Sequence, residues 1–71
     1  MCLSTVYRNE RLPQNIVMKN VMRMEARDGK LIFTDLMERR LVIDADFDSC
    51  DLTDSWIVIR PRADRNAGDA Q

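Results

Sequence analysis

Residues 16–35 read IVMKNVMRMEARDGKLIFTD, and this stretch decides the fold class. From Val21 onward apolar and polar residues mostly alternate, which is typical of a half-buried β-strand. The apolar positions are Met22, Met24 and Ala26, and the charged positions between them are Arg23, Glu25 and Arg27. Asp28-Gly29 follows, between this run and KLIFTD. An Asp-Gly pair between two apolar runs predicts a β-hairpin, because a type I′ turn needs φ > 0 at both central residues.

Two alternatives stay open for the first half of this stretch. Lys19-Asn20 interrupts the alternation, so residues 16–27 form either one bent strand or two short ones. The spacing of Val17, Val21 and Met24 also fits a helix, and Met and Arg are good helix formers. We favour strands, because the Asp-Gly turn and the β-rich segment behind it indicate strand pairing.

Short strands are also predicted on both sides of this hairpin. The expected strands are residues 3–7, 39–43, 47–52 and 56–59, with a polar loop at residues 9–15 and a turn at Thr53-Asp54. Several short strands at close spacing predict an all-β fold, a meander of five to seven strands that closes into a small barrel. We expect one domain over residues 1–60 and a flexible polar tail over residues 61–71.

Length and composition limit what this domain can be. The chain has 71 residues, is 45% hydrophobic and 32% charged, and has a formal net charge of −1. This composition is too apolar for a disordered chain, and no apolar run approaches the roughly 18 residues of a membrane span. The first residues, MCLSTVYRNER, do not have the pattern of a signal peptide, so we expect a cytoplasmic protein without a disulfide. A domain this small then gains support from a metal or from a partner subunit.

The absence of histidine narrows the chemistry. It excludes Ser-His-Asp and Cys-His catalysis, so we expect no enzyme. It also removes the commonest nitrogen ligand of transition metals. A metal site would have to use thiolate, carboxylate, the N-terminal amine or backbone amides.

Cys2 is the candidate metal ligand. If Met1 is removed, Cys2 carries both an α-amine and a thiolate, which can close a five-membered chelate ring on one ion. Sulfur and nitrogen in a square-planar set suit Ni(II) or Cu(II), and thiolate also suits Zn(II) or Cu(I). A two-fold axis would bring two such residues together, which links the metal to a dimer. The alternative is an inert cysteine.

The other sulfur and aromatic residues are interpreted as packing residues. Cys50 is expected to be a small core residue, and Trp56 a core or interface residue. Core packing rather than metal ligation is also expected for four methionines, Met18, Met22, Met24 and Met37.

The acidic run DADFD, residues 44–48, places a carboxylate at every second position. It superficially resembles the start of a calcium loop. Ser49 stands where that loop needs glycine and Ser55 where it needs glutamate, so a solvated strand face is expected.

Charge gives little support to nucleic-acid binding. Residues 1–59 carry 8 Lys/Arg against 10 Asp/Glu, a net charge of −2. The local basic candidates are Arg39-Arg40 and three arginines near the C-terminus, Arg60, Arg62 and Arg65. Because phosphate binding needs a basic face, a small RNA-binding module stays only the alternative function.

Three segments together resemble the CooT-type small nickel-binding proteins. They are MCLSTVYRNE (residues 1–10), IVMKNVMRMEARDGKLIFTDLMERR (residues 16–40) and DLTDSWIVIR (residues 51–60). The resemblance implies an SH3-like or Sm-like small barrel that forms a homodimer. It further implies that Cys2 of each subunit is a Ni(II) ligand at the interface. The polar tail and Cys50 match no motif of that family.

The resemblance also implies a function. The best-known member is an accessory protein for nickel insertion into carbon monoxide dehydrogenase, and the family has also been labelled a predicted RNA-binding protein. We therefore predict a nickel metallochaperone or nickel-handling accessory protein. Its partners would be a second copy and a nickel enzyme or its maturation factors, and its alternative function would be that of a small RNA-binding Sm-like module.

Overall fold

The computed structural model describes residues 3–62, which form six strands and one turn of 3-10 helix. The elements are β1 (Ser4–Arg8), η1 (Pro13–Asn15), β2 (Ile16–Arg27), β3 (Lys30–Asp35), β4 (Arg40–Ile43), β5 (Ala45–Asp51) and β6 (Trp56–Pro61). The predicted all-β class and the predicted number of strands are confirmed. The turn η1 falls within the predicted loop, where Pro13 suits the first position of a helical turn.

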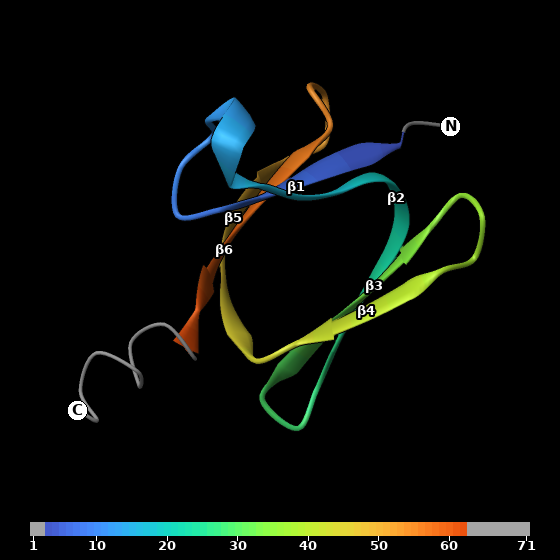
Figure 1. The fold of residues 1–71 in the computed structure, drawn as a ribbon, viewed down its shortest axis with the longest axis vertical. Coiled ribbons are helices and arrows are strands. Elements are labelled where there is room, and N and C mark those ends of the chain that lie inside the picture. The colour runs from blue at the N-terminus through green and yellow to red at the C-terminus, as the bar shows by residue number, and fades with distance from the viewer. Residues whose placement is uncertain (1–2, 63–71) are drawn as a thin grey trace.

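All six strands of residues 3–62 belong to one sheet, in the order β4-β3-β2-β1-β6-β5. Neighbouring strands are antiparallel except β1 and β6, which are parallel. The sheet curls into a half-barrel, with β2 curving from the β1–β6 side to the β3–β4 side (Figure 1). Its edge strands are β4 and β5, and in the described part of the chain they do not pair with each other. The predicted barrel is therefore open along one side.

Strand β2 is a single bent strand, as one of the two open alternatives predicts. Its first half pairs with β1 and its second half with β3. Asn20 has φ 58 at the bend, and the register shifts between Val21 and Arg23. This bulge changes the phase of the alternation, so that Val21 faces the core and Arg23 faces outward. The helical alternative for this segment is wrong.

The hairpin between β2 and β3 forms as its sequence predicts. Asp28 has φ 54 and Gly29 has φ 78. Both central residues thus have the positive φ that a type I′ turn requires.

A small apolar core fills the concave side of the sheet. Its buried members are Val6, Val21, Leu31, Phe33, Ala45, Ile57 and Ile59, with Val17, Met18 and Ile43 packed against them. Phe33 and Ile59 are fully buried and come from strands on opposite sides of the curl. The half-barrel therefore holds its shape mainly through contacts across its concave face.

Three of the four methionines assigned to the core are exposed, so that prediction is wrong for them. Met22 is 39% exposed, Met24 36% and Met37 72%, whereas Met18 packs against the core. Met22 lies at the bulge, Met24 lies opposite Phe33 of β3, and Met37 lies in the β3–β4 turn. Local alternation could not predict this, because a bulge and a turn interrupt the pattern at Met22 and Met37.

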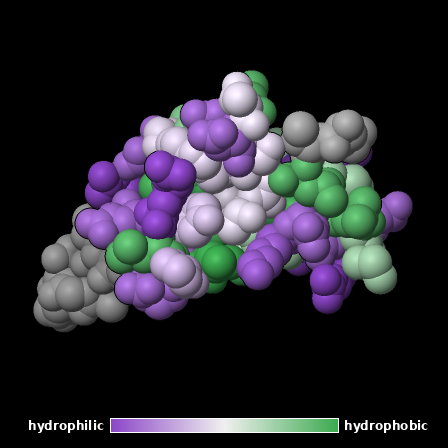
Figure 2. All heavy atoms as spheres, turned by 90° about the horizontal axis from the view of Figure 1, so that it is seen from above, coloured by the Kyte–Doolittle hydropathy of each residue, from purple (hydrophilic) through white to green (hydrophobic). Residues whose placement is uncertain are grey.

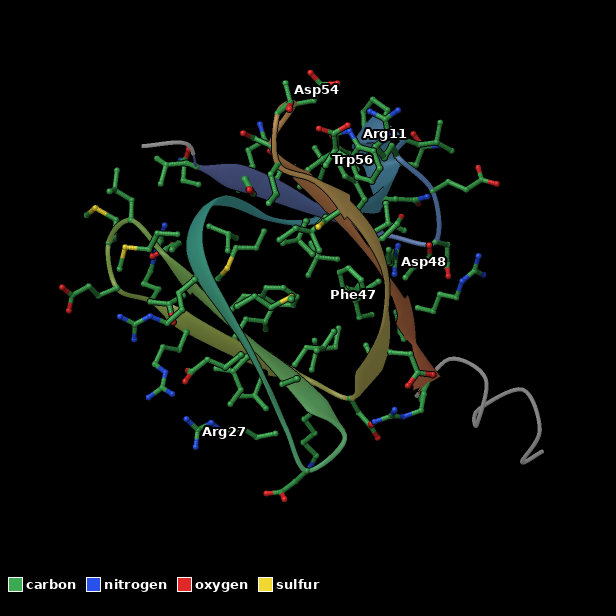
Figure 3. The ribbon with its side chains drawn as sticks, turned by 180° about the vertical axis from the view of Figure 1, so that it is seen from behind. Arg11, Arg27, Phe47, Asp48, Asp54 and Trp56 are labelled. Carbon is green, nitrogen blue, oxygen red and sulfur yellow. The ribbon has the colours of Figure 1, made fainter. Side chains whose placement is uncertain are left out.

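Trp56 is half-buried and lies on the sheet near the polar loop. The guanidinium carbon of Arg11 stands 4.3 Å from the centre of its ring. Figure 3 shows the two labelled side chains next to each other. This cation–π contact fastens the loop before η1 to the sheet.

The acidic run forms an ion-pair ladder with the last strand. Arg60 pairs with Asp48, and Arg62 pairs with Asp44 and Asp46. The hydrogen bond from Arg60 holds the pKa of Asp48 below its usual value. The backbone N–H of Arg62 also donates to the carbonyl of Asp44, at 2.9 Å. Contacts of the folded part therefore run two residues past the boundary predicted at residue 60, and the rest of the predicted tail lies outside the described residues.

Candidate metal centre and apolar groove

A groove of about 270 Å³ opens beside the start of β1. Four strands and the β5–β6 turn contribute to it. Its lining residues are Ser4, Val21, Met22, Arg23, Met24, Cys50, Leu52 and Ile57. All of them except Ser4 and Arg23 are apolar or weakly polar, so the groove offers an apolar surface with few hydrogen-bonding groups.

The register of the strands places further apolar side chains on the concave face, beyond those that line the groove. Met24 pairs with Phe33, and Phe47 pairs with Ile59, so each pair projects its side chains toward the concave face. Phe33 and Ile59 are fully buried, yet Met24 is 36% exposed and Phe47 47% exposed. Figure 3 shows Phe47 reaching from β5 into the space that the curled sheet surrounds. The concave face is thus apolar on both sides of its opening, along β2 and along β5.

Cys50 is an exposed free cysteine, so its predicted place in the core is wrong. It pairs with Ile57 and therefore shares the concave face. A register shift between Phe47 and Ser49 changes the phase of β5, and β5 is an edge strand with no neighbour on its outer side. Cys50 consequently faces the groove without being covered.

The predicted metal ligand, Cys2, lies outside the described residues. Ser4, two positions later, is the first residue of β1 and lines the groove with Cys50. Within residues 3–62, no group of three or more His, Cys, Asp or Glu side chains is placed to hold a metal ion. The described strands therefore bring Ser4 and Cys50 to one place without forming a metal site of their own.

Three of the eight large apolar side chains that are exposed within residues 3–62 line this groove. Met22, Met24 and Leu52 line it, and Leu52 is 81% exposed. Figure 2 shows apolar side chains gathered at one end of the molecule, whereas the other end of that face is mostly polar. Exposed apolar clusters of this kind mark interaction surfaces in small soluble domains.

A second apolar projection, Leu36-Met37, is held out by a buried carboxylate. Asp35 is 2% exposed, and its Oδ1 accepts the backbone N–H groups of Met37 at 2.9 Å and Arg39 at 2.8 Å. Arg39 Nε donates to Asp35 Oδ2 at 2.8 Å. Burial by itself raises the pKa of Asp35, but the hydrogen bonds and the charge of Arg39 outweigh it, so the pKa lies below its usual value. Sequence reasoning missed this residue, whose only local signal is an Asp at the start of a turn.

Comparison with known proteins identifies a family. Residues 1–60 match the family model described as CO dehydrogenase accessory protein CooT. A search of curated proteins finds no matching sequence. Within residues 3–62, no helix has the length and the apolar character needed to cross a membrane.

Proposed function

Because this chain belongs to the CooT family of CO dehydrogenase accessory proteins, we propose that it binds Ni(II) through Cys2 as a homodimer. In this proposal it is a cytoplasmic, non-catalytic protein that carries or stores the ion. The recipient is a nickel enzyme of the CO dehydrogenase type, or its maturation factors. Nickel is then the cargo of the protein and not a catalytic group.

One observation carries the proposal, namely that Ser4 lines the apolar groove. Two peptide units separate Cys2 from Ser4, and they span at most about 7 Å. A metal held by Cys2 would therefore be held close to the one groove that Ser4 and Cys50 share. Any protein that docks in this groove would meet the N-terminal residues of the chain.

The chemistry of Cys2 fits Ni(II). A thiolate together with an α-amine or backbone amide nitrogen gives the sulfur–nitrogen ligand set that Ni(II) accepts in a square-planar arrangement. One such residue fills only part of that set. A second copy, related by a two-fold axis, would complete it with the same atoms.

The groove also favours a second copy as the partner. A domain of this size buries little apolar surface on its own and gains stability from oligomerisation. Leu52 and Met24 expose apolar surface at the groove, and neither carries charge that would oppose close packing. A standard interface needs about 800 Å² from each partner, so the contact would have to extend beyond the groove itself.

RNA binding is the second candidate, and the ion pairs weigh against it. Of its predicted basic residues, Arg39 pairs with Asp35, Arg60 with Asp48, and Arg62 with Asp44. These three guanidinium groups already bind carboxylates, so they offer little charge to an RNA backbone, and among the predicted basic residues that the structure describes only Arg40 has no ion pair.

A nickel titration of the reduced protein tests the proposal. Wild type, Cys2→Ser and Cys50→Ser are compared, after mass spectrometry has established whether Met1 is present. We expect a thiolate-to-nickel absorption band in wild type and in Cys50→Ser, and none in Cys2→Ser. Equal bands in Cys2→Ser and wild type would refute ligation by Cys2. No band in any of the three would refute nickel binding.

A further inference from the structure

A second cavity lies next to the groove and shares Met22 and Arg23 with it, but its other lining residues do not line the groove. It has a volume of about 370 Å³, and β2, β3, β4 and the β3–β4 turn surround it. These three strands lie side by side on one side of the curl (Figure 1). The volume falls in the lower part of the range of about 300–1,000 Å³ that small-molecule sites occupy.

The register of the strands places three donor groups in one row. Arg23 pairs with Thr34, and Thr34 pairs in turn with Arg40. Side chains of directly paired residues project to the same side, so the two arginines stand on either side of Thr34. Neighbouring strands are about 4.8 Å apart, so the two arginine backbones are separated by about 10 Å. Both long side chains can reach a ligand above Thr34.

Thr34 lacks the partner that a buried hydroxyl usually has. It is 6% exposed and lines the cavity, and its side chain forms no hydrogen bond with any residue in the range 3–62. Buried polar groups are nearly always satisfied, so a hydroxyl left open toward a cavity indicates a ligand or ordered water there. This observation is independent of the two arginines.

The charges around the cavity also favour an anion. Arg23 and Arg40 form no ion pair within residues 3–62, in contrast to Arg39, which is bound to Asp35. Two carboxylates line the cavity as well, Glu25 and Glu38. Glu25 is held by Arg27 at 3.0 Å, which leaves Glu38 in the turn as the one carboxylate that opposes an anion.

From this arrangement we infer that the second cavity binds a small phosphate monoester or inorganic phosphate. Arg23 and Arg40 bind its oxygens through their paired N–H groups, and the Thr34 hydroxyl donates to a third oxygen. A tetrahedral oxyanion suits donors that arrive from two sides and from below. The site does not involve Cys2, so it does not depend on nickel ligation, although Arg23 also lines the groove proposed for the second copy.

The test is a titration of the full chain with inorganic phosphate at constant ionic strength, followed by backbone amide NMR shifts. We expect saturable shifts confined to residues 22–25, 34 and 38–40. Arg23→Gln and Arg40→Gln should each weaken affinity by at least about tenfold, and Thr34→Val by about threefold to tenfold. Glu38→Gln should tighten binding, and Arg8→Gln, on the distant strand β1, should leave it unchanged.

Several outcomes would overturn the inference. Linear shifts without saturation would show only screening by salt. Equal affinity in Arg23→Gln, Arg40→Gln and wild type would remove the two arginines from the site, provided that the melting temperatures agree. Saturable binding of a short single-stranded RNA without competition by phosphate would assign the face to nucleic acid. Cys2→Ser should bind phosphate as wild type does, whatever the result for nickel.

Discussion

Ser4 on β1 and Cys50 on β5 line the same apolar groove, although β6 lies between their strands. The curl of the sheet brings both residues to one groove. This relationship connects the start of the chain, where the proposed nickel ligand lies, with the apolar surface where a second copy would dock. Metal binding and dimer formation would then share one part of the molecule.

Charge placed in the groove should separate the dimer. Leu52→Glu and Met24→Glu introduce a carboxylate at exposed positions, so the fold should survive while an apolar interface would not. We expect either variant to weaken dimerisation by at least about 100-fold in sedimentation experiments. Val42→Glu is the matched control, because Val42 is 57% exposed on the edge strand β4 and does not line the groove. Dimers of unchanged stability in both groove variants would place the interface elsewhere.

The reactivity of Cys50 should report the same interface. Its thiol is free and exposed in the single chain, so it should react readily with a thiol reagent at low protein concentration. If a second copy covers the groove, the reaction should slow by about tenfold or more as the concentration rises through the dimer range. Measurements on Cys2→Ser isolate Cys50, and adding Leu52→Glu should abolish the concentration dependence. A rate that is independent of concentration would argue against a covered groove.

Asp35→Asn should destabilise the β3–β4 turn. An asparagine with its oxygen in the place of Oδ1 can still accept from both backbone N–H groups, but its amide nitrogen cannot accept from Arg39 Nε, which donates to Asp35 Oδ2 at 2.8 Å. We expect a fall in melting temperature of about 5–10 °C at pH 7, measured by circular dichroism. Asp54→Asn, in the exposed β5–β6 turn, should change it little. An unchanged melting temperature in Asp35→Asn would mean that the turn holds without this carboxylate.

The contribution of Asp35 to the free energy of unfolding should also depend on pH. The folded pKa of Asp35 is lowered, so its contribution is complete above the unfolded value of about 3.9 and is lost as pH falls through the folded value. The difference in free energy of unfolding between wild type and Asp35→Asn should therefore shrink as the solution is acidified below about pH 4. Denaturant titrations of both proteins between pH 7 and pH 2 measure this difference. A difference in unfolding free energy that stays constant across that pH range would contradict a lowered pKa of Asp35 in the folded protein.

Gly29→Ala should cost about 1–2 kcal/mol of unfolding free energy, because an alanine at φ 78 is strained. A Cβ at this position would also stand 3.1 Å from Arg62 Nη2, which would have to move away from Asp44. In the background of Arg62→Ala, Gly29→Ala should lose the part of its destabilisation that comes from the contact with Arg62. The part that comes from the strained backbone should remain. Asp28→Asn is the control, since asparagine readily adopts the left-handed conformation, and it should leave stability nearly unchanged. Equal stability of Gly29→Ala and wild type would contradict the turn geometry.

The sequence was informative where local chemistry decides the structure. The Asp28-Gly29 turn, the alternation after the bulge and the strand after Thr53-Asp54 all depend on near neighbours, and all are confirmed. Exposure of Met24 and Cys50 could not be predicted in this way. It depends on how the curl of the sheet brings β1, β2, β5 and β6 together around one groove.

For the candidate sites as well, the sequence predicts the chemistry of single residues but not which residues come together in space. The thiol chemistry of Cys2 is readable from the sequence, whereas the groove beside Ser4 results from four strands meeting in space. The row of Arg23, Thr34 and Arg40 likewise depends on register, which the bulge after Val21 shifts by one residue. Without that shift, Arg23 would face the core and no such row would form.

Native mass spectrometry of the reduced protein with added Ni(II) tests the central claim most directly. It measures the number of chains and the number of nickel ions in the same particle. We predict two chains with one nickel ion for wild type, and no bound nickel for Cys2→Ser at the same nickel concentration. A single chain that holds its own nickel ion, or a dimer of Cys2→Ser that retains nickel, would contradict a site shared between two Cys2 residues.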